Sequence, residues 1–267
     1  MPGKVEKDNA FNKKMVILES LILNAKKMTV FTGAGVSTLS GIPDFRGKNG
    51  LYSGLWHDLP VEQILNISFF EKHPEIFYEW AREFWYHLED YKPNVVHTTL
   101  AKMEQKGLVA GLYTQNIDML HKKAGSKKVY EVHGSAEHHH CHTCNKYYCY
   151  GEIAAQVQAG KVPFCSQCGG IVKPDIVFYG ENLDSLILAR AYEQFSHSDL
   201  CLVLGSSLTV QPAASFPYYA TSNGCPLVIV NAQKTSQDGG ASLRFEDLKQ
   251  TFLALDSWLD TLGSRNT

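Results

Sequence analysis

The stretch that decides the fold reads MTVFTGAGVS over residues 28–37. Apolar and β-branched residues run into a Gly-Ala-Gly turn, a pattern that predicts a buried strand leading into a helix. In a parallel sheet such turns lie at the carboxyl ends of the strands, where backbone amides and helix N-termini face an anion. Because Gly33, Ala34 and Gly35 are small, a pyrophosphate can approach the backbone there. The alternative is a tight turn without a ligand.

Apolar runs and helical patterns alternate outward from this stretch. Short runs alternating with helices predict an α/β fold with a parallel sheet that is covered by helices on both faces. The expected strands are 28–32, 108–114, 129–132, 199–204 and 226–231, and the expected helices are 11–27, 184–197 and 247–262. An aromatic-rich segment, 47–91, and a cysteine-containing segment, 138–174, interrupt the alternation. We expect them to build a second, smaller domain.

Two C-x2-C pairs, Cys141/Cys144 and Cys165/Cys168, are separated by twenty residues. This spacing is typical of a zinc ribbon, and four thiolates fill the coordination shell of Zn²⁺ without leaving a place for an activated water. The pattern therefore predicts one structural zinc ion. Disulfides between the paired cysteines are the alternative. The three other cysteines, however, are an odd number, which suits a protein of a reducing compartment: Cys149, Cys201 and Cys225.

Composition limits the partners. The formal net charge is −2, so nothing attracts nucleic acid or anionic membranes in general, and no apolar run reaches the roughly 20 residues that cross a bilayer. Residues 2–9 are polar, lack an export signal and are expected to form a frayed tail. We expect a cytoplasmic protein that does not bind membranes. Nucleic acid is not an expected partner, because the lysines of the cysteine-containing segment form no basic cluster.

Small polar residues end three more of the expected strands. They are Gly205-Ser206-Ser207, Asn231 and the string Thr114-Gln115-Asn116-Ile117-Asp118. Each is also ordinary turn chemistry, but their coincidence at one sheet edge favours a nucleotide site. The full dinucleotide fingerprint is absent, since Thr38 occupies the third glycine position. An ordinary dehydrogenase is therefore disfavoured.

Taken together, the motifs resemble those of a known family. The strings GAGVS (33–37), GIPDFR (41–46), TQNID (114–118), HG (133–134), VFYGE (177–181) and GSS (205–207) occur in family order with the cysteine pairs. Between about residues 29 and 231 the chain closely resembles a sirtuin, an NAD-dependent protein lysine deacylase. The alternatives are an ADP-ribosyltransferase on the same scaffold and a non-catalytic zinc-ribbon binding module.

The resemblance implies how the chain is divided. It implies a Rossmann-like NAD-binding domain made of residues 1–46, 92–137 and 177–267, a helical module at 47–91 and a zinc module at 138–176. It also implies a reaction in which the acyl oxygen of a modified lysine displaces nicotinamide from NAD. The products are nicotinamide, O-acyl-ADP-ribose and free lysine.

The resemblance also implies the roles of individual residues. His133, at a strand end, is the expected general base, with Asn116 as its catalytic neighbour. The expected NAD-binding residues are Gly33, Ala34, Gly35, Thr38, Asp44, Phe45, Arg46, Gln115, Asn116, Ile117, Asp118, His133, Gly205, Ser206, Ser207, Asn231 and Asp247. Phe45 is expected to shield the reacting carbon, and Arg46 to contact phosphate oxygens.

The acyl-lysine protein or peptide is expected to bind as an added strand along Val177, Phe178 and Tyr179. Sirtuins that favour acidic acyl groups carry Tyr and Arg three positions apart in the helical module, whereas Tyr78 and Arg82 stand four apart. We therefore expect acetyl and other uncharged acyl groups. The histidines beside the first cysteine pair are read as solvated neighbours of the metal: His138, His139, His140 and His142.

Overall fold

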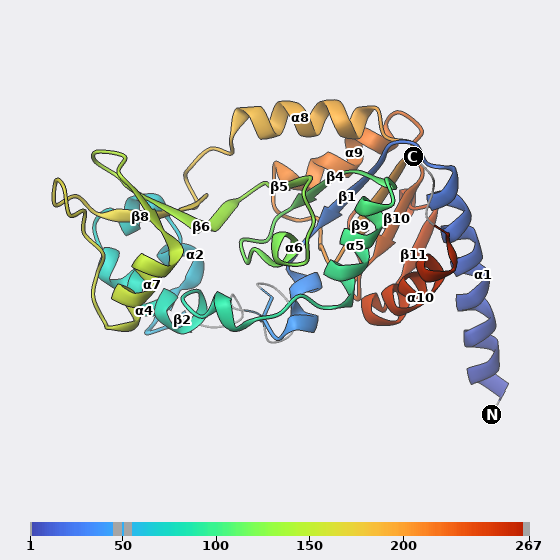
Figure 1. Ribbon diagram of the computed structural model, residues 1–267, viewed down its shortest axis with the longest axis horizontal. Helices are drawn as coiled ribbons and strands as arrows, with labels where there is room; N and C mark the ends of the chain where they lie inside the picture. Colours follow the sequence, from blue (N-terminus) through green and yellow to red (C-terminus); the bar gives the residue numbers. More distant parts are fainter. Residues whose placement is uncertain (1, 45–49, 51–54, 264–267) are drawn as a thin grey trace.

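The larger of two lobes is built on a six-stranded sheet in the computed structural model, which describes residues 2–44, 50 and 55–263 (Figure 1). All strand pairs in this sheet are parallel. In spatial order the strands are β11 (Leu243–Phe245), β10 (Leu227–Val230), β9 (Leu200–Leu204), β1 (Met28–Thr32), β4 (Val109–Thr114) and β5 (Val129–Glu131). Numbered along the chain, this is the doubly wound order of dinucleotide-binding folds, and the chain order reverses between β1 and β9. The predicted Rossmann-like sheet is confirmed.

The strands are buried on both faces, as their continuous apolar runs predict. In β1, Met28 and Val30 pack on one face while Phe31 packs on the other. The first face is covered by α1 (Pro2–Asn24), α5 (Val95–Gln105) and α10 (Leu248–Thr261), and the second by α8 (Ser185–Ser196) and α9 (Phe216–Thr221). Figure 1 shows α8 and α9 above the sheet. The expected tail at 2–9 is wrong, because α1 begins at Pro2.

The smaller lobe combines a helical and a zinc-module part around one core. Its aromatic centre includes Phe70, Phe77 and Trp80, which pack with Val172 and Ile176 of the neighbouring small sheet. Its elements are β2 (Leu55–Trp56), β3 (Leu59–Pro60), α2 (Val61–Ile64), α3 (Ile67–Phe70), α4 (Pro74–Phe84), β6 (Gly134–Cys141), β7 (Tyr147–Cys149), α7 (Tyr150–Gln158) and β8 (Val172–Ile176). The antiparallel order β7-β6-β8 makes a separate three-stranded sheet.

Tyrosine hydroxyls join the two parts of the smaller lobe. Tyr78 Oη donates to the carbonyl oxygen of Val172 at 2.5 Å, and Tyr150 Oη donates to that of Trp85 at 3.0 Å. Buried hydroxyls paired in this way fix the relative position of two packed elements. The helical segment and the zinc segment therefore form one structural unit. The residue boundaries that we expect between the domains stay a prediction.

Short helical turns complete the fold. They are η1 (Ala34–Ser40), η3 (Leu88–Asp90), α6 (Leu120–Lys123), η4 (Ala213–Ser215) and η5 (Asp238–Gly240). Across the described ranges, no helix is both long and apolar enough to cross a membrane.

Candidate active site

A cavity of about 950 Å³ lies where the two lobes meet, at the carboxyl ends of β1 and β9. This volume is within the range that ligand sites span. The cavity brings together most of the residues that the sequence singled out. They are Ala34, Gly35, Asp44, Gln115, Asn116, Ile117, His133, Val177, Phe178, Tyr179, Gly205, Ser206, Ser207 and Asn231.

The glycine turns after β1 and β9 lie directly against each other. Gly35 N donates to Gly205 O at 2.8 Å, and a Cβ atom on either Gly33 or Gly35 would lie 2.8 Å from that same oxygen. Gly205 has φ +59°, and a Cβ there would lie 2.4 Å from Val36 N. The close contact between the two turns therefore requires glycine at these three positions, whether or not a ligand is bound. Together the turns form one backbone platform at the point where dinucleotides bind in such sheets.

Asn116 and Asp118 belong to one buried hydrogen-bond network. Asn116 Nδ2 donates to Gly33 O and to Ser37 Oγ, both at 3.1 Å, and Ser37 Oγ donates to Asp118 Oδ2 at 2.5 Å. Asp118 Oδ1 also accepts from Leu120 N at 2.9 Å. Burial raises the pKa of Asp118, while these hydrogen bonds oppose the shift. Asp118 lines a small cavity of about 30 Å³ that also contacts Asn116 and Ile117.

Sequence reasoning missed the part that Ser37 plays in this network. Ser37 is 2 % exposed, and its hydroxyl joins the two predicted residues. Ser37 belongs to the GAGVS string, but only the fold reveals that its hydroxyl faces residues 79 and 81 positions along the chain.

His133 is half-buried two residues after β5, at the junction of the lobes. Its Nδ1 lies 3.2 Å from the carbonyl oxygen of Gln115. A carbonyl oxygen only accepts hydrogen bonds, so Nδ1 carries the proton and the neutral ring keeps its lone pair on Nε2. Burial lowers the pKa of His133, and the bond to Gln115 partly opposes this. The imidazole is therefore neutral near pH 7 and able to accept a proton.

Gly134 allows this placement of His133. It has φ +77°, and a Cβ atom there would collide with the carbonyl oxygen of Asp175 at 1.9 Å. Only glycine adopts this conformation in such a confined position. The next strand contact, Val177 N to His133 O at 2.9 Å, then places the segment 177–179 beside the histidine.

Polar side chains line the part of the cavity near β9 and β10. Ser206 Oγ donates to Gln115 Oε1 at 2.8 Å, and Asn231 Nδ2 donates to Gln233 O at 2.9 Å. Ser206 and Asn231 are 3 % and 4 % exposed, so their orientations are set by these contacts. Hydroxyls and amides at this edge suit the hydroxyl-rich ligand that the sequence predicts.

Some predicted cofactor residues do not line the main cavity. Gly33 lies behind it and accepts from Asn116, while exposed Thr38 donates from Oγ1 to Gly35 O at 2.8 Å. Asp247 is the N-cap of α10, where its Oδ1 accepts from Gln250 N at 2.8 Å. This capping contact uses one carboxylate oxygen, and the expected adenine-side role of Asp247 stays a prediction. Phe45 and Arg46 lie outside the described residues.

The segment 177–179 lines the cavity and is already paired on one side. Tyr179 N donates to Leu65 O at 2.8 Å, and Ile67 N donates to Tyr179 O at 3.0 Å. Further lining residues were not among the predicted site residues, because only the fold brings the elements and loops that carry them to this cavity. They are Leu65, Trp85, Ile176, Gly180, Glu181, Asn182, Leu183, Ser185, Leu188, Thr209, Val210, Gln211, Pro212 and Gln233.

Tyr78 and Arg82 do not line this cavity. Tyr78 is 2 % exposed, and its hydroxyl is bonded to Val172 in the core of the smaller lobe. Neither lysine nor arginine occurs in the described lining. Among the described residues, then, the cavity offers no cation for an acidic acyl group.

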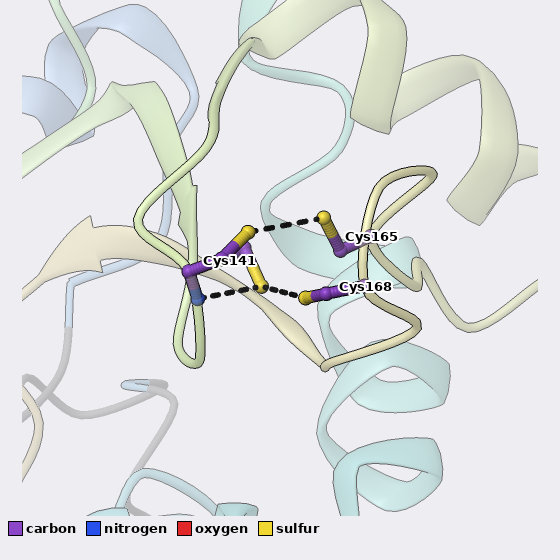
Figure 2. A group of neighbouring side chains, drawn as sticks. Cys141, Cys165 and Cys168 are labelled. Carbon is purple, nitrogen blue, oxygen red and sulfur yellow. Dashed lines mark hydrogen bonds between the residues drawn. The ribbon is translucent and has the colours of Figure 1, made fainter.

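The four predicted metal ligands form one cluster. Their sulfur atoms all lie within 4.8 Å of one another, with 3.5 Å between the sulfurs of Cys141 and Cys168 and 3.6 Å between those of Cys144 and Cys165. Figure 2 shows the three labelled side chains pointing toward a common centre. A tetrahedron with Zn–S bonds of roughly 2.3 Å has edges of about 3.8 Å, so the four thiols fit one zinc ion. Nothing in this donor set is left for a reactive water.

Two residues near the cysteine cluster, Cys149 and His139, do not belong to it. Cys149 is exposed, lies outside the cluster and N-caps α7. His139 is fully buried, and its Nε2 lies 2.9 Å from Tyr86 Oη, so the expectation that it is solvated is wrong. Burial lowers the pKa of His139 to about 3. It is a neutral core residue of β6.

A family model, curated relatives and solved structures that match this chain all belong to one family. The model of the Sir2 family matches residues 33–212. An NAD-dependent protein deacetylase of Thermotoga maritima is 44% identical over 84% of this chain and 89% of that protein. An NAD-dependent protein deacylase 2 of Archaeoglobus fulgidus is 41% identical over 82% and 85%. A solved Sir2 complex with a p53 peptide and NAD⁺ has a TM-score of 0.83 and 39% identity, covering 92% of this chain and 97% of that one.

Proposed function

This chain belongs to the Sir2 family, and from that premise we propose that it is an NAD-dependent protein lysine deacylase. It releases nicotinamide, O-acyl-ADP-ribose and free lysine. The observation that carries the proposal is the common cavity: His133, Asn116 and the glycine platform all meet the segment 177–179 there. Bound NAD supplies a ribose carbon that accepts the acyl oxygen while nicotinamide leaves.

The residues around the platform fit such a dinucleotide. Ala34, Gly35 and Gly205 bring backbone close to the pyrophosphate, while Ser206, Ser207 and Asn231 offer polar atoms to the adenosine half. Gln115 and Asn116 would orient the nicotinamide ribose. Asp118, which Ser37 holds and which lines the adjoining small cavity, would bind the carboxamide.

His133 is the proposed general base. Its Nδ1 is held by Gln115, and the lone pair on Nε2 is available to accept a proton from a ribose hydroxyl. The lowered pKa keeps the ring neutral under the conditions in which it must accept that proton. This division of the two ring nitrogens is a direct consequence of the backbone contact.

The acylated peptide is proposed to bind as a strand along Val177, Phe178 and Tyr179. Tyr179 already pairs with the chain at residues 65–67, so the peptide would approach from the cavity side. Strand addition reads the main chain and tolerates varied sequences. The apolar side chains of Leu65, Trp85 and Ile176 in the lining favour acetyl and other uncharged acyl groups. A related Sir2 structure, with a TM-score of 0.81, contains a propionylated peptide.

We propose that the zinc ion has a structural role. Cys141, Cys144, Cys165 and Cys168 hold it within the smaller lobe, in which β6 also begins directly after His133. The cluster thus stabilises the strand next to the base without contributing to the chemistry.

The proposal is tested with an acetyl-lysine peptide. With NAD, nicotinamide release should equal deacetylation mole for mole, and omission of NAD should abolish both. Full deacetylation without NAD would overturn the proposal. Covalent labelling of protein by NAD without any acylated substrate would instead favour an ADP-ribosyltransferase.

A further inference from the structure

Lys173 is a largely buried lysine next to the cavity, and the proposed mechanism does not use it. Its side chain is 12 % exposed, and it lies in β8. Nζ donates to Ile176 O at 2.7 Å and to Pro174 O at 3.2 Å, and lies 2.9 Å from Glu181 Oε2. It also lies 4.3 Å from the centre of the Phe178 ring. All these partners belong to the segment 174–181.

Burying an ammonium group is unfavourable unless charge and hydrogen bonds compensate for the lost water. Burial lowers the pKa of Lys173, and the carboxylate of Glu181 opposes this. The ladder of β8 with β6 is made by backbone atoms and does not need the amine. The amine bonds to Pro174 and Ile176 within β8 and contacts Phe178 and Glu181 beyond it, so it joins the end of β8 to the segment that follows.

Glu181 contacts both Lys173 and the backbone of Phe178. Its Oε2 accepts from Phe178 N at 2.7 Å while it pairs with Lys173. The Phe178 ring is anchored in the core, 5.4 Å from the ring of Phe70 and 5.1 Å from that of Phe77. Lys173, Phe178 and Glu181 thus form a clamp around the turn at Gly180, which has φ +93°.

The clamp fixes the part of the chain that lines the cavity. Val177 N is bonded to His133 O, and Tyr179 is paired with residues 65–67. The clamp adds a third support from the side of β8. Glu181 N also donates to Phe178 O at 3.0 Å, so the amides of residues 177–179 and the carbonyl oxygens of Phe178 and Tyr179 have partners. Among the described contacts this leaves the carbonyl oxygen of Val177, which lines the cavity, to accept from a peptide.

We infer that Lys173 is a positioning residue for the acylated peptide. This role rests on the proposed deacylase function: the Lys173 clamp holds residues 177–179 in the conformation in which the carbonyl oxygen of Val177 can accept from the substrate backbone. The amine itself touches neither the peptide nor the nucleotide. Its loss should weaken peptide binding and leave nucleotide binding nearly unchanged.

The test compares three variants of the full chain. Lys173→Met removes the charge but keeps an unbranched apolar side chain, and Glu181→Gln removes the other half of the ion pair. Lys146→Met is the control, because Lys146 also lies over an aromatic ring, 5.4 Å from the centre of Tyr148, but bonds to Ser166 in the zinc module. Peptide Kd by fluorescence anisotropy without NAD, both KM values, kcat and the melting temperature are measured.

We expect Lys173→Met to raise the peptide Kd and the peptide KM about tenfold, while the KM for NAD stays within about twofold. Glu181→Gln should give a smaller rise, and the double variant should be less impaired than the product of the single effects, because both act through one contact. Lys146→Met should change none of these constants.

Two results would overturn the inference while leaving the deacylase function intact. One is an unchanged peptide Kd in Lys173→Met, whatever the effect of Glu181→Gln, because Glu181 itself lines the cavity. The other is a loss that follows the fraction of folded protein and affects NAD and peptide equally. An unmodified chain without NAD-dependent deacylation would instead refute the proposed function.

Discussion

The Nδ1 atom of His133 lies 3.2 Å from the backbone carbonyl oxygen of Gln115, a contact that joins the chain after β5 to the chain after β4. It leaves the lone pair of the neutral imidazole on Nε2. The same carbonyl precedes Asn116, so the ring and the amide that are proposed to handle the ribose are set by one short segment. The catalytic geometry thus depends on the end of a parallel strand.

Replacing His133 tests its role as the base. Because general-base catalysis contributes roughly 10²–10⁴-fold, His133→Ala should lower kcat by about that factor while NAD binding by calorimetry persists. The matched control is His197→Ala, which removes an exposed histidine at the end of α8. Near-normal turnover by His133→Ala would require a different base.

The pH profile tests the protonation state of the same residue. Burial lowers the pKa of His133 below 6.5, so the reactive neutral form persists to a lower pH than for a free histidine. kcat/KM should therefore be level near pH 7 and fall only as the pH drops through a value below 6.5. An acidic limb centred above pH 6.5 would contradict the assignment.

Ser37→Ala tests the network behind the nicotinamide site. The change removes the donor to Asp118 and the acceptor of Asn116. Leaving these buried groups without a partner should cost about 1–3 kcal/mol, measured by denaturant unfolding. The KM for NAD should rise about tenfold with little change in peptide affinity. Ser222→Ala, which removes an exposed hydroxyl at the end of α9, provides the control.

Gly205→Ala tests the contact between the two glycine turns. A methyl group would lie 2.4 Å from Val36 N at a residue with φ +59°, so the β1 and β9 turns must separate. Gly224→Ala is matched for strain, with φ +77°, but has nothing within 4 Å of the new Cβ. The control should lose about 1–2 kcal/mol of stability. Gly205→Ala should lose more than the control and should also bind NAD more weakly; equal losses would show that the close contact is unimportant.

Removing the metal tests its structural role. Because zinc binding is coupled to folding, Cys141→Ala or strong chelation should unfold the smaller lobe and abolish activity, and excess NAD should not restore it. Cys149→Ser, outside the cluster, should retain one zinc ion per chain by elemental analysis and remain active. Full activity in a zinc-free protein would contradict the structural role.

The fold could be predicted from local patterns where they were strong. The strand at 28–32 matches β1, and the other four expected strands differ by one or two residues at their ends. β11 was not predicted, because it has only three residues and carries Arg244 at its centre. Its place in the sheet comes from parallel pairing with β10, which no local pattern reveals.

The candidate site also has features that local patterns predict and features that they do not. The cysteine spacing predicted a cluster because its geometry is nearly local within each pair. The part of Ser37, the capping by Asp247 and the burial of Tyr78 depend on which distant residues the fold brings near. The clamp around Lys173 is likewise visible only after β8 is placed against the smaller core.

The most direct test of the central claim is a mass-spectrometric analysis of the products formed from NAD and an acetyl-lysine peptide. We expect equal amounts of nicotinamide, O-acetyl-ADP-ribose and free-lysine peptide from the unmodified chain, and far slower formation of all three by His133→Ala. Free acetate appearing in place of O-acetyl-ADP-ribose as the first product, in a reaction that proceeds without NAD, would contradict the central claim.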